Sequence, residues 1–486
     1  MKKIISILAL TLIISMSCKK EFLEILPKST ITLDLLFNTD KDFQDAVIGT
    51  YYELQDFYDY YWQFGDLAGD DCIQSALRQT DRMRVDNFVN DVNDALLDNA
   101  WRDLYQVIQR ANTLLSNIES ADASVITNKD LYTGEAKFIR ALAYFDLVRI
   151  FGDLPMITAP VTVQAALETK RTAVDIIYND VIIKDLIDAE AKLPETYSSA
   201  NIGRATKGAA KSLLGLVYLT RKNFPLAESK LMEVTSMGYS LLPDFNDLFN
   251  FNNEHHKEYI FDIEYIDGNV GLGSVYQRDF LAEVQDVGLT FRDALRKKYG
   301  IQGAESGGAG TPNPEFMALF NPLDKRKDRT VITGIYDADG NWVPIPESAA
   351  IKALCLKYTA PIVTDGKVNW RVIRYADVLL MLAEALNENN KTAQALPYLN
   401  QVHKRAGLTE IAAGLTQSQL RDSIALERRL ELYLEGTRWF DLVRTGEAMN
   451  ACAKYGMKSH MTIFPVPQTQ IEVVNDKDIF DQNEGY

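Results

Sequence analysis

The chain has 486 residues, of which 47% are hydrophobic and 24% are charged, proportions typical of a globular protein and too apolar for a disordered one. Its formal net charge of -16 argues against nucleic acid as a partner, because phosphate binding needs clustered Lys and Arg. The same acidity is a poor match for an anionic membrane surface, and neutral ligands remain open.

The N-terminal residues 1–17 are typical of a lipoprotein signal peptide. Lys2 and Lys3 precede an apolar run that is too short to cross a bilayer as a helix, which takes about 20 residues. Ser17 then precedes Cys18, an arrangement similar to the lipobox of bacterial lipoproteins. We therefore predict lipid attachment at Cys18, with an ordinarily cleaved or uncleaved signal as the alternative.

The stretch FYDYYWQFGD, residues 57–66, places six aromatic residues within eight positions. These aromatics follow neither a helical nor a strand period, so they require either burial on all sides or a loop. Tyr and Trp combine an apolar face with a polar rim, which suits stacking against the C–H faces of a sugar ring. We expect Tyr60, Tyr61 and Trp62 to form a stacking platform, with core packing under a variable lobe as the alternative.

Five further residues are candidate ligand contacts. Asp70, Asp71 and Arg78 follow the aromatic stretch closely and are expected to hydrogen-bond the edge of a bound sugar. Tyr276 and Trp342 are aromatics in predicted loops, where an aromatic side chain serves either a ligand or local packing.

Aromatics at helical spacing are expected in the core instead: Trp101, Tyr105, Phe145 and Trp439.

Two predicted helix pairs have the spacing of tetratricopeptide repeats. Gly215 and Ala227 in the first pair, and Ala383 and Ala395 in the second, are separated by the same twelve-residue step. Small residues at these positions let two helices approach closely. The pattern predicts a mainly α fold built on a scaffold of tetratricopeptide-like helical repeats.

An irregular insertion separates the two helix pairs. Residues 301–314 are rich in Gly and Pro, and residues 331–345 read as strand, Asp-Gly turn, strand. We expect one domain over residues 18–486, with the repeat scaffold at roughly 35–240 and 370–450. A large irregular lobe with short strands and hairpins is expected at roughly 241–369, where it offers loops for a binding site.

A column of acids marks a late predicted helix. Glu427, Glu431 and Glu435 stack at i, i+4 spacing, which is unfavourable unless cations from elsewhere neutralise them. Arg438 and Arg444 follow directly and are the expected partners. We interpret this column as an ion-paired structural brace rather than a catalytic site.

The cysteines, the histidines and one loop that begins like a calcium site are not expected to carry chemistry. Cys72, Cys355 and Cys452 are widely spaced, without a disulfide or metal-binding pattern, and are expected to be buried. In DADGNW, Trp342 stands at the position where a calcium loop needs glycine, so this stretch is read as a turn. His255 and His256, adjacent to each other, are expected in a solvated loop. No metal site and no cofactor is predicted.

Five long stretches, in the correct order, resemble the SusD/RagB family of nutrient-capturing outer-membrane lipoproteins of Bacteroidetes. They are EFLEILPKST after Cys18, the Trp101–Glu119 helix, the Gly134–Thr158 block, the Glu427–Gly446 block, and FPVPQTQIEVV with the terminal QNEGY. In the last stretch Glu484 stands where the family often has proline.

The resemblance implies a right-handed helical-repeat scaffold with a variable lobe. It also implies a surface lipoprotein that caps a TonB-dependent transporter of the SusC type and binds oligosaccharides, less often peptides, without catalysis or cofactor. An enzyme is the alternative from another class, since Asp66, Asp70 and Asp71 could supply the two carboxylates of a glycoside hydrolase. A third possibility is a repeat protein whose concave face holds a partner protein.

Overall fold

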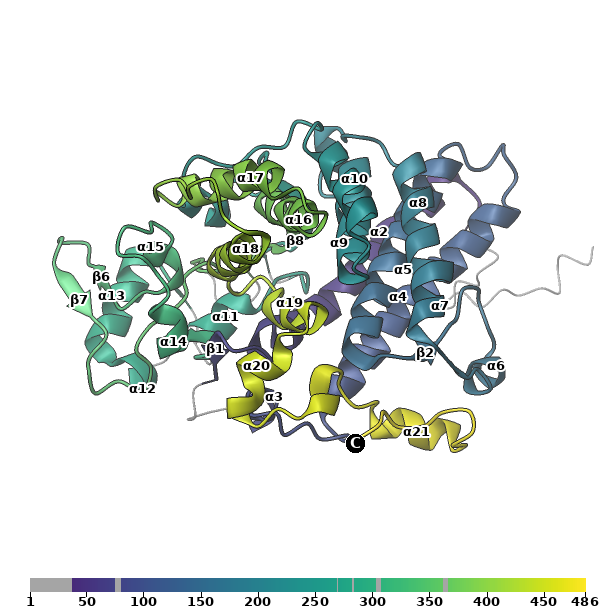
Figure 1. Ribbon diagram of the computed structural model, residues 1–486. Helices are drawn as coiled ribbons and strands as arrows, with labels where there is room; N and C mark the ends of the chain where they lie inside the picture. Colours follow the sequence, from purple (N-terminus) through teal and green to yellow (C-terminus); the bar gives the residue numbers. More distant parts are fainter. Residues whose placement is uncertain (1–36, 75–79, 269, 282–283, 303–306, 362–365) are drawn as a thin grey trace, which may run out of the picture.

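The computed structural model describes residues 37–486 except 75–79, 269, 282–283, 303–306 and 362–365. Within these residues the fold is mainly helical, as the periodicity predicts (Figure 1). The predicted signal peptide, Cys18 and Arg78 lie outside the described residues.

The scaffold is a row of long helices built from two separate parts of the sequence. The first part contributes α2 (Asp40–Tyr58), α4 (Ala95–Ser120), α5 (Lys129–Phe151), α8 (Ile183–Lys192), α9 (Lys207–Thr220) and α10 (Phe224–Val234). The second part contributes α16 (Tyr375–Glu388), α17 (Thr392–Arg405) and α18 (Gln417–Glu431). Because α10 packs against α16, the row continues from one part into the other (Figure 1).

The two predicted helix pairs are confirmed as α9–α10 and α16–α17. Gly215 in α9 lies against Leu231 in α10, and a Cβ at Gly215 would come within 2.6 Å of a Leu231 methyl carbon. Ala383 and Ala395 are fully buried between α16 and α17. Small side chains therefore set the close approach of each pair.

The remaining helical elements are short. They are α3 (Thr80–Asp86), η3 (Gln63–Leu67), α6 (Val163–Leu167), α7 (Val174–Ile177), η4 (Tyr178–Ile182), η5 (Ser199–Asn201), η6 (Phe245–Phe249), α11 (Tyr276–Phe280), α12 (Val284–Val287), α13 (Leu289–Tyr299), α14 (Pro314–Met317), α15 (Lys327–Thr330), α19 (Arg438–Thr445), α20 (Ala448–Cys452), η7 (Ala453–Tyr455), η8 (Ser459–Thr462) and α21 (Gln468–Val474).

The strands form antiparallel pairs rather than a large sheet. They pair as β1 (Cys72–Ile73) with β5 (Thr311–Pro312), β2 (Leu154–Pro155) with β3 (Arg171–Thr172), β4 (Tyr259–Ile263) with β8 (Trp370–Arg374), and β6 (Gly334–Tyr336) with β7 (Trp342–Pro344). The β6–β7 pair confirms the hairpin predicted at residues 331–345.

The segment between β4 and β8 forms a lobe beside the scaffold (Figure 1). It has a hydrophobic cluster of its own, which includes Phe291 and Leu295 of α13 and Ile335 of β6. We call residues 264–369 the lobe. In Figure 1 the β6–β7 hairpin lies at the outer end of this lobe, far from α4 and α5.

Buried residues confirm several sequence-based expectations. Trp101, Phe145 and Trp439 are buried, whereas Tyr105 is half-buried and donates its hydroxyl to the carbonyl of Pro155 at 2.8 Å. The three cysteines that the structure describes, Cys72, Cys355 and Cys452, are buried free thiols.

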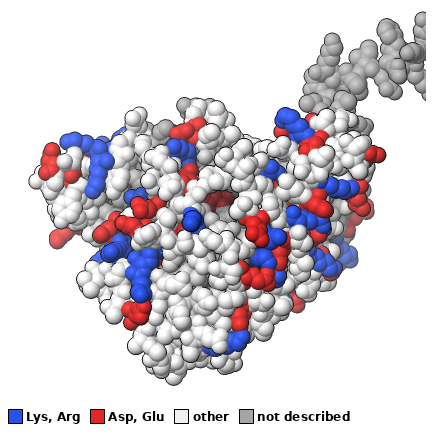
Figure 2. Space-filling view, turned by 90° about the horizontal axis from the view of Figure 1, so that it is seen from above, with Lys and Arg blue, Asp and Glu red and all other residues white. Residues whose placement is uncertain are grey.

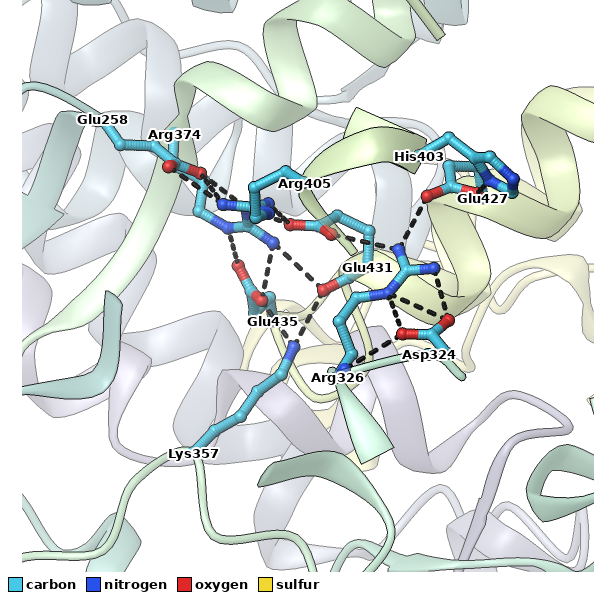
Figure 3. Close-up of polar contacts among 10 residues, drawn as sticks. All are labelled: Glu258, Asp324, Arg326, Lys357, Arg374, His403, Arg405, Glu427, Glu431 and Glu435. Atoms are coloured by element: carbon cyan, nitrogen blue, oxygen red, sulfur yellow. Dashed lines mark hydrogen bonds and ion pairs between the residues drawn. The ribbon is translucent and has the colours of Figure 1, made fainter. Parts of the chain in front are cut away.

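The column of acids, Glu427 and Glu431 on α18 and Glu435 in the turn after it, is a structural brace, but its cations come from other elements than predicted. Figure 3 shows the acids surrounded by Arg326 and Lys357 of the lobe, Arg374 of β8, and His403 and Arg405 of α17. The predicted partners bind elsewhere: Arg438 binds Asp70, and Arg444 binds Glu384 and Asp441. The turn after Gly436 carries Arg438 and Arg444 away from the column, onto α19.

The brace joins the lobe to the scaffold through fully buried charges. Arg326 donates to Glu431 at 3.1 Å, and Lys357 donates to Glu435 at 2.7 Å. Burial alone would raise the pKa of Glu431, but Arg405, Arg374 and Arg326 hold that pKa well below its usual value. Since an unpaired buried charge is strongly destabilising, this network fixes the lobe on the scaffold.

Candidate functional site

The aromatic stretch at residues 57–66 is core, and this contradicts the predicted stacking platform. Trp62 is fully buried; its ring lies edge-on to Phe280 of the lobe, with ring centroids 5.1 Å apart, and the Arg82 guanidinium lies over it. Tyr61 is 6% exposed, and its hydroxyl accepts a hydrogen bond from Arg149.

Tyr60 is half-buried, and its hydroxyl already has a hydrogen-bond partner in the protein. Its hydroxyl donates to Asp103 at 2.6 Å, and its ring lies edge-on to Phe57. The rest of the stretch, Tyr61 to Asp66, is buried, and its second half forms part of the π-helical turn η3. No flat face of Tyr61 or Trp62 is available to a sugar.

Asp70 and Asp71 are not free hydrogen-bonding partners either. Asp70 forms ion pairs with Arg429 at 2.9 Å and with Arg438 at 2.7 Å, and Asp71 pairs with the same two arginines. Burial acts to raise the pKa of Asp70, but Arg438 and Arg429 outweigh it and keep that pKa below its usual value. For Asp71, burial dominates and raises the pKa to about 6. These acids tie the chain after α2 to α18 and α19.

Tyr276 is also a core residue, contrary to expectation. It is fully buried, its hydroxyl donates to Tyr265 at 2.6 Å, and its ring packs against Trp370. Tyr276 therefore holds the lobe against β8 and cannot contact a ligand.

Among the predicted contact residues that the structure describes, Trp342 is the one with an exposed side chain. It is 51% exposed on β7, and its cross-strand partner Tyr336 on β6 is 60% exposed. The two ring centroids lie 5.1 Å apart with the planes inclined at 63°. Together they form an angled aromatic surface, which we call the aromatic hairpin.

The sequence of the hairpin explains why both rings face outward. Side chains alternate across a strand, so Ile335 and Val343 pack against the lobe core while Tyr336 and Trp342 point away from it. Gly334 has no side chain, and a Cβ at this position would overlap the Trp342 indole. The indole therefore lies closely over the backbone at Gly334, which limits its rotation.

Tyr336 is a candidate that the sequence analysis missed. The signal was available: Tyr336 and Trp342 stand at symmetric positions on either side of the Asp-Gly turn, so hairpin register makes them neighbours.

Charged groups lie beside the aromatic hairpin. The backbone N–H groups of Asn341 and Asp339 donate to Asp337, which fixes the turn and lowers the pKa of that carboxyl. Lys297 of α13 lies 3.9 Å from Asp339, and both side chains are well exposed. The hairpin thus presents aromatic faces flanked by exposed side chains that can donate or accept hydrogen bonds.

A groove of about 730 Å³ lies between the turn after α9 and helices α16, α18 and α19. Its wall combines apolar side chains with charged ones that are already paired, such as Glu384 with Arg444 and Glu388 with Arg421. A ligand there would have to compete with these ion pairs, so the groove's volume alone does not identify it as the site.

Two further properties of the described part of the chain concern metal binding and membrane insertion. No group of three or more His, Cys, Asp or Glu is arranged there to hold a metal ion. His255 binds Glu264 at 2.9 Å. None of the helices there has the length and apolar character needed to span a membrane. Figure 2 shows Lys and Arg interspersed with Asp and Glu over the face seen from above.

Comparison with known proteins identifies the family. Residues 362–486 match the SusD family, and residues 21–219 match a family described as "Starch-binding associating with outer membrane". SusD-like protein P25 of Formosa agariphila is 30% identical over 469 residues, which cover 88% of this chain and 87% of that protein. The chain belongs to the SusD family.

Solved structures agree with this SusD-family fold. A laminarin-binding SusD-like protein is 26% identical and superposes with a TM-score of 0.77, covering 93% of this chain and all of that one. Surface glycan-binding protein A from Bacteroides thetaiotaomicron in complex with laminarihexaose has a TM-score of 0.74 at 23% identity, covering 92% of this chain and 99% of that one. At that identity, the second likeness concerns the fold alone.

Proposed function

We propose that this SusD-family protein captures an oligosaccharide at the cell surface and delivers it to a TonB-dependent outer-membrane transporter of the SusC type. The observation that carries the proposal is the aromatic hairpin, where Trp342 and Tyr336 present exposed ring faces at the outer end of the lobe. An exposed aromatic face suits the C–H face of a sugar, and the polar groups beside it suit its hydroxyls.

The relatives support a glycan as the ligand. A structural relative of 26% identity is named a laminarin-binding protein, and one matching family is described as starch-binding. Both names describe neutral glucose polymers, and a neutral ligand agrees with a chain of net charge -16. Peptide capture, known in the same family, is the alternative.

Surface attachment is proposed to run through Cys18. The N-terminal sequence has the basic, apolar and Ser-Cys segments of a lipoprotein signal, and one matching family is described as associating with the outer membrane. Two acyl chains on Cys18 would give stable anchoring where one would be marginal.

The role is binding without catalysis and without a cofactor. The carboxylates considered for a glycoside hydrolase are buried at the base of the lobe: Asp66 is 2%, Asp70 is 7% and Asp71 is 2% exposed. Asp70 and Asp71 are held by arginines, so these side chains are poorly placed to act on a surface-bound glycan.

Titration of the mature protein with a panel of polysaccharides and peptides tests this function. Laminarin and starch are the first probes, followed by other neutral and acidic polysaccharides and by a mixture of casein peptides. We expect saturable binding to at least one polysaccharide with no release of reducing ends. Binding to peptides and to no polysaccharide would favour the alternative, and steady release of reducing ends would indicate an enzyme.

A further inference from the structure

The two rings of the aromatic hairpin are exposed and also contact each other. Of the Phe, Tyr and Trp side chains that the structure describes, three are exposed: Tyr52 on α2, and Tyr336 and Trp342 on the hairpin. The planes of the two hairpin rings are inclined at 63°, with the centroids 5.1 Å apart. A ligand that covers both rings therefore meets two planes that point in different directions.

Gly334 holds the Trp342 indole at this inclination. Gly334 and Tyr336 are two positions apart on β6 and so lie on the same face of the hairpin as Trp342. The indole covers Gly334, which is buried, and a Cβ at this position would overlap Cζ2 and Cε2 of the indole. The indole thus occupies the space that any larger residue at position 334 would fill.

Backbone hydrogen bonds at both ends of the hairpin hold Tyr336 in place as well. Directly after Tyr336, the backbone N–H of Asp337 donates to the carbonyl of Asn341 at 2.9 Å. At the other end, the backbone N–H of Ile345 donates to the carbonyl of Thr333 at 2.8 Å. The inclination of the rings is therefore present before a ligand arrives, which lowers the cost of binding a ligand that fits it.

Two inclined planes discriminate between glycan backbones of different shape. A sugar stacks with its C–H face parallel to an aromatic ring. The backbone of a cello-oligosaccharide is a nearly flat ribbon, so its sugars present parallel faces and stack on one of the two rings at a time. The backbones of laminari- and malto-oligosaccharides coil, so neighbouring sugars present faces at an angle to each other and can stack on both rings.

We infer that the aromatic hairpin selects glycans whose backbone turns between neighbouring sugars, and that Gly334 positions Trp342 for this selection. The inference rests on the proposed function, which makes the hairpin the glycan surface, and adds the shape of the chain that this surface accepts. Gly334 acts through the indole that lies over it, so it is a positioning residue.

Calorimetric titration of the mature protein with three glucose hexasaccharides tests the selection. Laminarihexaose, maltohexaose and cellohexaose contain the same sugar in the same number, so the linkage and the backbone shape are what differ. We expect at least one of the two coiled hexasaccharides to bind about tenfold more tightly than cellohexaose. Equal or tighter binding of cellohexaose would overturn the inference, and so would the absence of binding to both coiled hexasaccharides.

Substitution of Tyr336 tests whether two planes are needed. Tyr336→Ala leaves a single aromatic plane, so the affinity for the coiled hexasaccharide should fall about tenfold, to that for cellohexaose. Tyr336→Phe returns the ring and should restore the preference. A preference for the coiled hexasaccharide that survives Tyr336→Ala would overturn the inference.

Substitution of Gly334 tests the positioning role. Gly334→Ala should displace the indole and lower the preference for the coiled hexasaccharide several-fold, with the affinity for cellohexaose retained. Gly49→Ala is the matched control, because a Cβ there meets the Arg110 guanidinium at an ordinary 3.7 Å. Melting temperatures are measured for both variants, and an equal loss of affinity for both kinds of hexasaccharide in Gly334→Ala would contradict the positioning role.

Failure of the selection and failure of the proposed function give different results. If cellohexaose binds as tightly as the coiled hexasaccharides, glycan capture stands and the selection by shape is wrong. If no polysaccharide of the wider panel binds, the proposed function is wrong and the inference with it.

Discussion

Arg326 and Glu427 lie 101 positions apart in the sequence, yet Nη1 of Arg326 donates to Oε1 of Glu427 at 2.8 Å where neither side chain is more than 3% exposed. The first belongs to the lobe and the second to α18 of the scaffold. This contact and its neighbours in Figure 3 turn a loop-rich insertion into a fixed platform for the aromatic hairpin. The proposed function of the aromatic hairpin depends on that rigidity.

Arg326→Met should destabilise the protein strongly. The change leaves Glu427 and Glu431 buried with fewer cations, and breaking a buried ion pair typically costs about 3–5 kcal/mol. Arg421→Met is the matched control because Arg421 pairs with Glu388 at an exposed position, where about 0–1 kcal/mol is expected. Thermal unfolding measures both, and equal effects of the two substitutions would contradict the brace.

Trp62→Ala should lower stability without a selective loss of ligand binding. Removing a fully buried Trp that packs against Phe280 should cost about 3–5 kcal/mol. Denaturant unfolding gives this value, and polysaccharide affinity is measured at a temperature where the variant remains folded. Wild-type stability combined with lost affinity would restore the stacking platform that the structure contradicts.

Asp59→Asn should stabilise the protein at high pH and have little effect at low pH. Burial raises the pKa of Asp59 from 3.8 to about 7, and Oδ1 of Asp59 has no hydrogen-bond partner in the described part of the chain. Between these two values the folded protein binds more protons than the unfolded chain, so stability falls as pH rises through the window. Asparagine abolishes that loss, which amounts to about 4 kcal/mol at most. Melting curves at pH 4 and pH 8 check this, and the same difference at both pH values would exclude the mechanism.

Cys18→Ala should release the protein from membranes. The substitution removes the site of the two acyl chains. The described part of the chain contains no helix able to span a bilayer. Fractionation of cells into membrane and soluble material gives the answer, with Cys452→Ala as a control at a buried thiol. A membrane fraction unchanged by Cys18→Ala would rule out the lipid anchor at this residue.

Local patterns in the sequence were sufficient for the scaffold and the hairpin. The twelve-residue step from Gly215 to Ala227 reports on two adjacent helices, and the Asp-Gly turn before Trp342 reports on two adjacent strands. In both cases the contacting residues lie within a few tens of positions, so periodicity and turn chemistry define the contact.

Long-range partners could not be predicted in the same way. Glu427 and Glu435 were correctly expected to need cations, but their partners Arg326 and Lys357 come from the lobe, which no local pattern indicates. The aromatics at 57–66 posed the same problem, since burial of Trp62 depends on Phe280, more than two hundred positions away. Whether these aromatics form part of the core or an exposed platform is decided by how the lobe packs against them.

The affinity of Trp342→Ala for the polysaccharide that the wild-type protein binds most tightly tests the central claim most directly. Trp342 is half exposed, so its removal should leave the melting temperature nearly unchanged, and Tyr52→Ala serves as a control at an exposed tyrosine outside the hairpin. We predict at least a tenfold loss of affinity for Trp342→Ala, about 1.4 kcal/mol, and wild-type affinity for Tyr52→Ala. Wild-type affinity in Trp342→Ala would contradict the aromatic hairpin as the glycan-binding surface.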